Sequence, residues 1–214
     1  MKILKAGLSI NLSNMNKKKL IEFENEIAEL FNKAKIKSPI HLHSNNENYL
    51  INFFKKNVKK NDWIFCSWRS HYHCLLKGVP VNKLKKEILK GKSISLCFPK
   101  YKIYSSAIVG GSLPIALGVA MSLKRKKSKK KVFCFIGDMT SETGIAHETI
   151  KFSINKKLPI HFIIEDNDKS VCTDTKKTWS IKKLTYEKKN NKYITYYKYK
   201  LKYPHAGAGV RVQF

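Results

Sequence analysis

Two polar side chains that could bind a metal ion follow two apolar stretches of this chain. Asp138 comes soon after the apolar run at residues 132–136, and Asn167 comes soon after the run at 160–164. If these runs form neighbouring parallel strands, their carboxyl ends lie roughly 5 Å apart. A carboxylate, an amide oxygen and a nearby backbone carbonyl would then face one crevice, and Mg²⁺ prefers such hard oxygen ligands. The spacing therefore predicts a site for Mg²⁺ and a diphosphate.

A helix between the two runs would position this site. Residues 140–142 are Thr, Ser and Glu, which favour a helix start, and apolar side chains recur near helical spacing at Ile145 and Phe152, with Thr149 between them. Two strands joined by one helix run parallel, as a βαβ unit. The amino end of the helix would add partial positive charge that favours an anion.

The same stretch resembles a known cofactor motif. GDM…ETG…HE…LPIHFIIEDN looks like the thiamine-diphosphate motif of the alpha subunits of 2-oxo acid dehydrogenase complexes, in their decarboxylating component. The family's glutamate after the motif aspartate matches Glu148. The resemblance implies thiamine diphosphate and Mg²⁺ as cofactors, with the metal on Asp138, Asn167 and the backbone carbonyl of Lys169.

Two positions depart from the family motif. Met139 stands where the family has a second glycine, which costs backbone freedom at the turn, and Asp166 stands where the family has its first asparagine. Without the second polar turn at Asn167, the Gly-Asp pair would indicate only a turn at the end of a strand. The resemblance still implies that Gly137, Asp138 and Met139 lie against the cofactor.

Three further stretches extend the resemblance. The run WRSH is similar to the family's Tyr-Arg-x-His, which implies that Trp68 and Arg69 touch the diphosphate end of the cofactor. A guanidinium can bind phosphate oxygens bidentately, although a surface salt bridge is the simpler alternative for Arg69. The run AIVG matches a stretch whose backbone meets the aminopyrimidine, which implies contacts at Ala107 and Val109. His41 falls on the family's histidine that faces the substrate, which implies a catalytic role.

Composition bounds the class of protein. The chain has 214 residues, 43% hydrophobic content and a formal net charge of +28. These values fit one globular domain, and no apolar run is long enough to span a membrane. The lysines are spread along the chain, with one cluster at 124–131 that lacks interleaved aromatics, so no specific nucleic-acid binding is expected. Five cysteines without a CxxC pair favour reduced thiols and a cytoplasmic location.

The strand and helix patterns predict an α/β fold, a parallel sheet with helices on both faces, and the resemblance implies that it is the thiamine-diphosphate-binding fold. Residues 1–37 form a predicted N-terminal helical segment, with an amphipathic helix at 16–37. Residues 38–175 form the predicted cofactor-binding domain. Residues 176–214 form a C-terminal tail, in which 193–203 reads as an exposed strand.

The resemblance implies an alpha-type subunit that decarboxylates a 2-oxo acid, passes on the acyl unit and needs a beta-type partner. Two alternatives stay open: the cofactor-binding half of a split transketolase-like enzyme, acting on a sugar, and a non-catalytic relative that binds cofactor or a partner. A zinc site on two H-x-H pairs, His41 with His43 and His71 with His73, is a further alternative.

Overall fold

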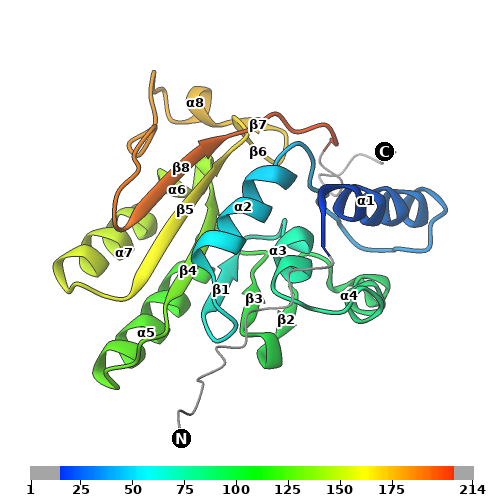
Figure 1. The fold of residues 1–214 in the computed structure, drawn as a ribbon. Coiled ribbons are helices and arrows are strands. Elements are labelled where there is room, and N and C mark those ends of the chain that lie inside the picture. The colour runs from blue at the N-terminus through cyan, green and yellow to red at the C-terminus, as the bar shows by residue number, and fades with distance from the viewer. Residues whose placement is uncertain (1–14, 205–214) are drawn as a thin grey trace, which may run out of the picture.

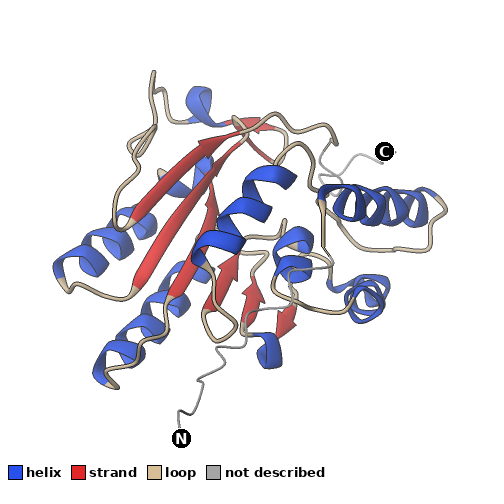
Figure 2. Cartoon of the chain, viewed as in Figure 1, coloured by secondary structure: helices blue, strands red, loops and turns tan. Residues whose placement is uncertain are grey.

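The computed structural model describes residues 15–204, and a six-stranded sheet runs through them in the order β2-β3-β1-β4-β5-β8 (Figures 1 and 2). Neighbouring strands are parallel except β2 and β3, which are antiparallel. The strands are β1 Trp63–Cys66, β2 Cys97–Phe98, β3 Ile103–Ser105, β4 Val132–Gly137, β5 Ile160–Asp166 and β8 Ile194–Lys198. A separate two-stranded sheet pairs β6 Lys169–Ser170 with β7 Thr173–Asp174.

Helices cover both faces of the sheet. They are α1 Lys17–Asn32, α2 Glu47–Asn57, α3 His71–Leu76, α4 Val81–Glu87, α5 Ser112–Arg125, α6 Asp138–Ser141, α7 Gly144–Asn155 and α8 Thr175–Thr178, with a π-helical turn at Ile88–Lys92 and a 3-10 turn at Pro99–Tyr101.

Alternate residues of β4 supply the two cores. Helices α1 to α4 lie on one face of the sheet, and α5 and α7 lie on the other (Figure 1). Phe133 and Phe135 pack with α1 to α4, whereas Cys134 and Ile136 pack with α5 and α7. Because successive side chains of a strand point to opposite faces, one continuous apolar run can feed both cores. The predicted fold class, a mostly parallel α/β sheet with helices on both faces, is confirmed.

The predicted βαβ unit is present, but its helix starts later than expected. Strands β4 and β5 pair in parallel, with Val132 opposite Ile160 and Gly137 opposite Glu165. Residues 138–141 form only the short helix α6, and α7 begins after Thr143, whose hydroxyl oxygen accepts the backbone N–H of Ala146 at 3.4 Å. The expected helix start at 140–142 was therefore wrong, because Thr143 supplies the cap.

The buried face of α7 also differs from the prediction. The face turned to the sheet carries Ala146, Thr149 and Ile150, whereas Ile145 and Phe152 remain 39% and 38% exposed. Only Thr149 of the predicted stripe is buried. Ala146 and Ile150 belong to the same core cluster as residues of α5 and β4, and α7 packs mainly against α5.

Near the amino end, the predicted helix at 16–37 is shorter. Helix α1 ends at Asn32, and Ala34 has a left-handed backbone with φ of 55°. Ile36 lies in the loop after the helix and is also buried, so the apolar pattern in the sequence extends beyond the end of the helix. Helix α4 continues into the π-helical turn at Ile88–Lys92, where Gly91 breaks the helical backbone with φ of 82°.

Strand β8 is part of the main sheet and not an exposed strand. Ile194 and Tyr197 are buried, and Tyr197 stacks on Tyr49 of α2 with ring centroids 3.7 Å apart. The alternation of aromatic and polar residues indicated a strand correctly, but Tyr197 packs under α2, whereas Tyr193 and Tyr196 pack against the core on the other face of the sheet. The division into 1–37, 38–175 and 176–214 stays a prediction; α1 and β8 pack with the central part, and the outer ends of the first and third parts lie outside the described residues.

All five cysteines are free, and Cys134 is buried as expected. Burial raises the pKa of the Cys134 thiol to about 12, so this thiol stays protonated and unreactive. Within residues 15–204, no helix has the length and apolar character that crossing a membrane requires.

Candidate diphosphate and metal site

Asp138 and Asn167 meet at the carboxyl edge of the sheet. Asp138 directly follows β4, Asn167 directly follows β5, and these strands are neighbours. The backbone N–H of Asn167 donates a hydrogen bond to the Asp138 carboxylate. The strand pairing thus brings the two predicted metal ligands together in the crevice where open α/β sheets bind ligands.

Burial makes Asp138 an unusual acid. It is the main reason that the pKa of the Asp138 carboxyl rises from 3.8 to about 7, and the negative charge of Asp166 acts in the same direction. Hydrogen bonds from the Thr175 hydroxyl and the Asn167 N–H oppose the shift. A cation at this carboxylate would favour its charged form, so the carboxylate is suited to a metal ion.

The turn after β5 holds Asn167 in place. The Asn167 side chain accepts the backbone N–H of Lys169 at 3.1 Å through Oδ1 and donates from Nδ2 to the Tyr199 hydroxyl at 3.1 Å. Asp168 has φ of 64°, and its N–H donates to Asp166 at 2.8 Å. An amide oxygen has two lone pairs, so Oδ1 of Asn167 can still accept a metal ion.

Most of the predicted site residues line one small cavity of about 20 Å³. They are Trp68, Arg69, Gly137, Asp138, Met139, Asn167 and Lys169. The other lining residues were not predicted from the sequence; they are Ser67, Thr140, Glu165, Ser170 and Tyr199. Thr175, the hydroxyl partner of Asp138, was not predicted either.

The cavity and its donors fit a metal ion better than a whole cofactor. A space of this size holds about one water or ion, and its carboxylate, amide and hydroxyl oxygens are hard ligands of the kind that Mg²⁺ prefers. A diphosphate would therefore lie at the mouth of the cavity. Over residues 15–204, no group of three or more His, Cys, Asp and Glu side chains is arranged to hold a metal, so the zinc alternative gains no support.

Arg69 is buried beside this cavity. The side chain is 8% exposed, and its Nε–H donates to the backbone carbonyl of Leu42 at 3.0 Å. This anchoring argues against a surface salt bridge. His41 does not line the cavity. Its ring packs beside that of Trp68, which does line the cavity, with the ring centroids 5.8 Å apart.

The stretch expected to meet the aminopyrimidine lies elsewhere on the same edge. Ala107 and Val109 are exposed in the loop between β3 and α5, and neither lines the cavity with Asp138. Gly110 in this loop has φ of 73°. The structure therefore does not gather Ala107 and Val109 with the metal-binding group.

The local backbone tolerates the residues around the site. Asn45 has φ of 63°, a left-handed backbone that asparagine tolerates better than most residues. Tyr72 is buried and donates to Glu47 at 3.1 Å. Met139 lies in α6 without a positive φ, so the expected cost in backbone freedom does not arise.

Fold and site together define an α/β protein with a ligand site at the carboxyl edge of a parallel sheet. Residues 15–196 match the family described as dehydrogenase E1 component, and the chain belongs to this family.

Two relatives illustrate the match. The alpha subunit of acetoin:2,6-dichlorophenolindophenol oxidoreductase of Bacillus subtilis is 29% identical over 156 residues, which cover 68% of this chain and 46% of that protein. The pyruvate dehydrogenase E1 component subunit alpha of Rickettsia prowazekii is 30% identical over 164 residues, which cover 72% and 50%. The chain thus spans about half the length of these relatives.

Proposed function

We propose that this chain is an alpha-type subunit that binds thiamine diphosphate and Mg²⁺ and takes part in decarboxylating a 2-oxo acid, with transfer of the acyl unit. One observation carries the proposal: Asp138, Asn167 and Arg69 converge on one cavity at the carboxyl edge of the sheet, in a chain of the E1 family. Family membership favours a 2-oxo acid over the sugar of a transketolase-like enzyme.

Each residue has a proposed part in holding the cofactor. Asp138, Asn167 and the carbonyl of Lys169 would bind Mg²⁺, and Arg69 with Trp68 would bind diphosphate oxygens. When bound, thiamine diphosphate supplies a carbon nucleophile that takes up the electrons released as carbon dioxide leaves. Gly137 and Met139 would lie at the diphosphate, and Ala107 and Val109 would lie at the aminopyrimidine. His41 would face the substrate.

The pyrimidine end of the cofactor needs another source of contacts, and we assign it to a beta-type subunit. The carboxylates near the site already serve internal hydrogen bonds: Glu47 accepts from Tyr72, and Glu165 accepts from Tyr197. The exposed Val109 and Ile108 are available to a neighbouring subunit. The free thiols support a cytoplasmic location for this assembly.

The experiment is an assay of carbon dioxide release from pyruvate and related 2-oxo acids, with thiamine diphosphate and Mg²⁺. The purified chain alone is expected to be inactive, and activity should appear when a beta-type subunit is added. Full turnover by the chain alone would contradict the need for a partner.

A non-catalytic relative that binds the cofactor is the second candidate. The cavity of about 20 Å³ has room for an ion but not for a substrate, which favours this candidate. Cofactor binding without any decarboxylation in the presence of the partner would support this candidate over an enzyme.

A further inference from the structure

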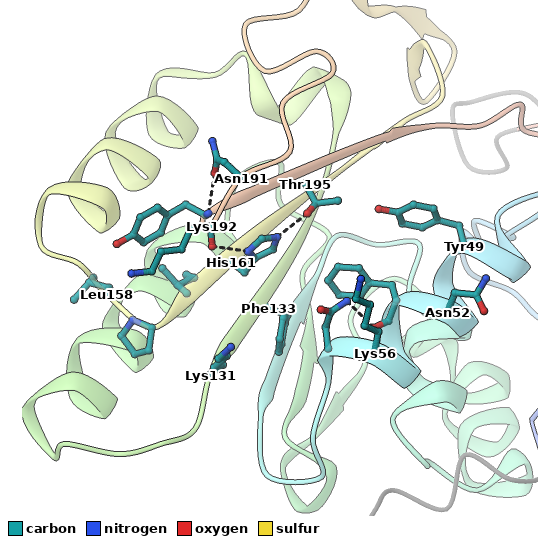
Figure 3. A pocket seen from close by; sticks show the side chains of 15 residues that line it. Tyr49, Asn52, Lys56, Lys131, Phe133, Leu158, His161, Asn191, Lys192 and Thr195 are labelled. Atoms are coloured by element: carbon teal, nitrogen blue, oxygen red, sulfur yellow. Dashed lines mark hydrogen bonds between the residues drawn. The ribbon is translucent and has the colours of Figure 1, made fainter.

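A second and much larger cavity lies at the opposite edge of the sheet. Its volume is about 570 Å³, and it opens between α2 and the amino ends of β4, β5 and β8 (Figure 3). It shares no lining residue with the cavity at Asp138. Small-molecule sites usually have volumes of roughly 300–1,000 Å³, so this cavity can hold an organic ligand.

The charged side chains that line this cavity are all lysines. Lys56, Lys131 and Lys192 line it, and no aspartate or glutamate is among the described residues that do. None of the three ammonium groups forms an ion pair within residues 15–204. An anion entering the cavity would therefore meet cations that no carboxylate already neutralises.

The inner wall is aromatic. Phe53 of α2 and Phe133 of β4 meet edge to face, with ring centroids 5.8 Å apart, and Tyr49 lies on the same side as Phe53. Figure 3 shows Tyr49 and Lys56 on the helix side and His161 and Thr195 on the strand side, with Phe133 between them. A flat apolar group placed here would pack against ring faces and edges.

His161 gives the opposite wall a fixed shape. Its Nδ1 bonds the carbonyl of Lys192 at 2.9 Å, and its Nε2 bonds the Thr195 hydroxyl at 2.8 Å. Burial lowers the pKa of His161, and the positive charge of Lys131 lowers it further, against the hydrogen bond to Lys192. The ring is therefore neutral near pH 7, and a charge placed in the cavity would change its pKa.

We propose that this cavity binds a small aromatic anion, with the ring against Phe53 and Phe133 and the anionic group among Lys56, Lys131 and Lys192. The ring would exclude water from the aromatic wall, and the anion would neutralise the uncompensated lysines. The proposal concerns a separate site and does not depend on the cofactor.

Phenyl phosphate is the probe for this site, used with the whole chain at physiological ionic strength. It should bind in calorimetry, shift the His161 ring resonances in NMR spectra and raise the pKa of His161 because a negative charge comes near. Inorganic phosphate lacks the ring and benzyl alcohol lacks the charge, so each should bind at least tenfold more weakly.

Matched variants separate a built site from general attraction to a basic protein. K56Q with K131Q should weaken phenyl phosphate binding tenfold or more, whereas K126Q with K182Q, which removes two exposed lysines elsewhere, should leave it unchanged. Asp138→Ala should also bind the probe normally. Equal weakening in both double variants, tight binding of inorganic phosphate, or binding without any change at His161 would overturn the proposal.

Discussion

At the scale of single residues, the surroundings of Asp138 disfavour the charged form of its carboxyl group. Burial raises its pKa to about 7, although Thr175 and the Asn167 N–H both donate to the carboxylate. A buried acid with these hydrogen bonds, beside an amide oxygen, supports the proposal that a cation binds here. Arg69 is also buried at this cavity, where its guanidinium is proposed to bind phosphate oxygens.

The raised pKa predicts how stability depends on pH without Mg²⁺. An unfolded Asp138 titrates near its ordinary value of 3.8, whereas the folded one titrates near 7, so the folded state binds more protons between these values. The free energy of unfolding therefore falls as pH rises from about 4 to 7. Asp138→Asn removes this penalty and should be about 2 kcal/mol more stable than the unchanged chain at pH 8. Urea unfolding at pH 4 and pH 8 measures it, and a constant difference between the two proteins would contradict the prediction.

Arg69→Lys tests the proposed phosphate contact. A bidentate guanidinium contact becomes a point charge, so thiamine diphosphate should bind about tenfold more weakly. Arg125→Lys is the matched control, because Arg125 is exposed at the end of α5 and should not affect binding. Calorimetry with Mg²⁺ present compares the variants; unchanged affinity for Arg69→Lys would remove Arg69 from the site.

The sequence predicted some of these residues and not others, for a physical reason. Asp138 and Asn167 could be placed together because two apolar runs ending in polar residues imply adjacent parallel strands. Thr175 and Tyr199 reach the site from α8 and from the segment after β8. No local pattern relates those segments to the strand ends, so only the folded chain reveals them.

At the scale of elements, sequence patterns predicted what forms better than where it begins and ends. Strands β4 and β5 were clear because buried parallel strands are apolar throughout. The start of α7 was misplaced because several residues before Gly144 can cap a helix, and the structure uses Thr143. The short strand β3 was missed because three residues carry little periodicity, and its place beside β1 depends on tertiary packing.

The loop between β3 and α5 offers a test at this scale. Gly110 has φ of 73°, and a Cβ there would come within 2.7 Å of the Ile145 side chain on α7. Gly110→Ala should lower the free energy of unfolding by roughly 1–3 kcal/mol. Gly118→Ala in the middle of α5 meets no atom within 4 Å and should be neutral or stabilising by up to about 1 kcal/mol. Thermal unfolding of both variants decides the matter, and equal stability would contradict the role of Gly110.

At the scale of the whole molecule, the chain carries a formal net charge of +28 that the proposed cofactor site does not explain. Such a charge should make the chain adhere to polyanions without sequence preference. Retention on a heparin column should be strong at low salt and fall steeply as salt rises, and DNA duplexes of different sequence should bind alike. A marked preference for one sequence would contradict this account.

The central claim is that the carboxyl edge of the sheet binds thiamine diphosphate through Mg²⁺. The most direct measurement is calorimetric titration of the cofactor into the chain, with and without Mg²⁺. The account predicts binding only with Mg²⁺, and a loss of at least a hundredfold in affinity for Asp138→Ala, while Glu29→Ala, at an exposed carboxylate on α1, binds as the unchanged chain does. If Asp138→Ala bound the cofactor as tightly as the unchanged chain, the site would be wrongly assigned.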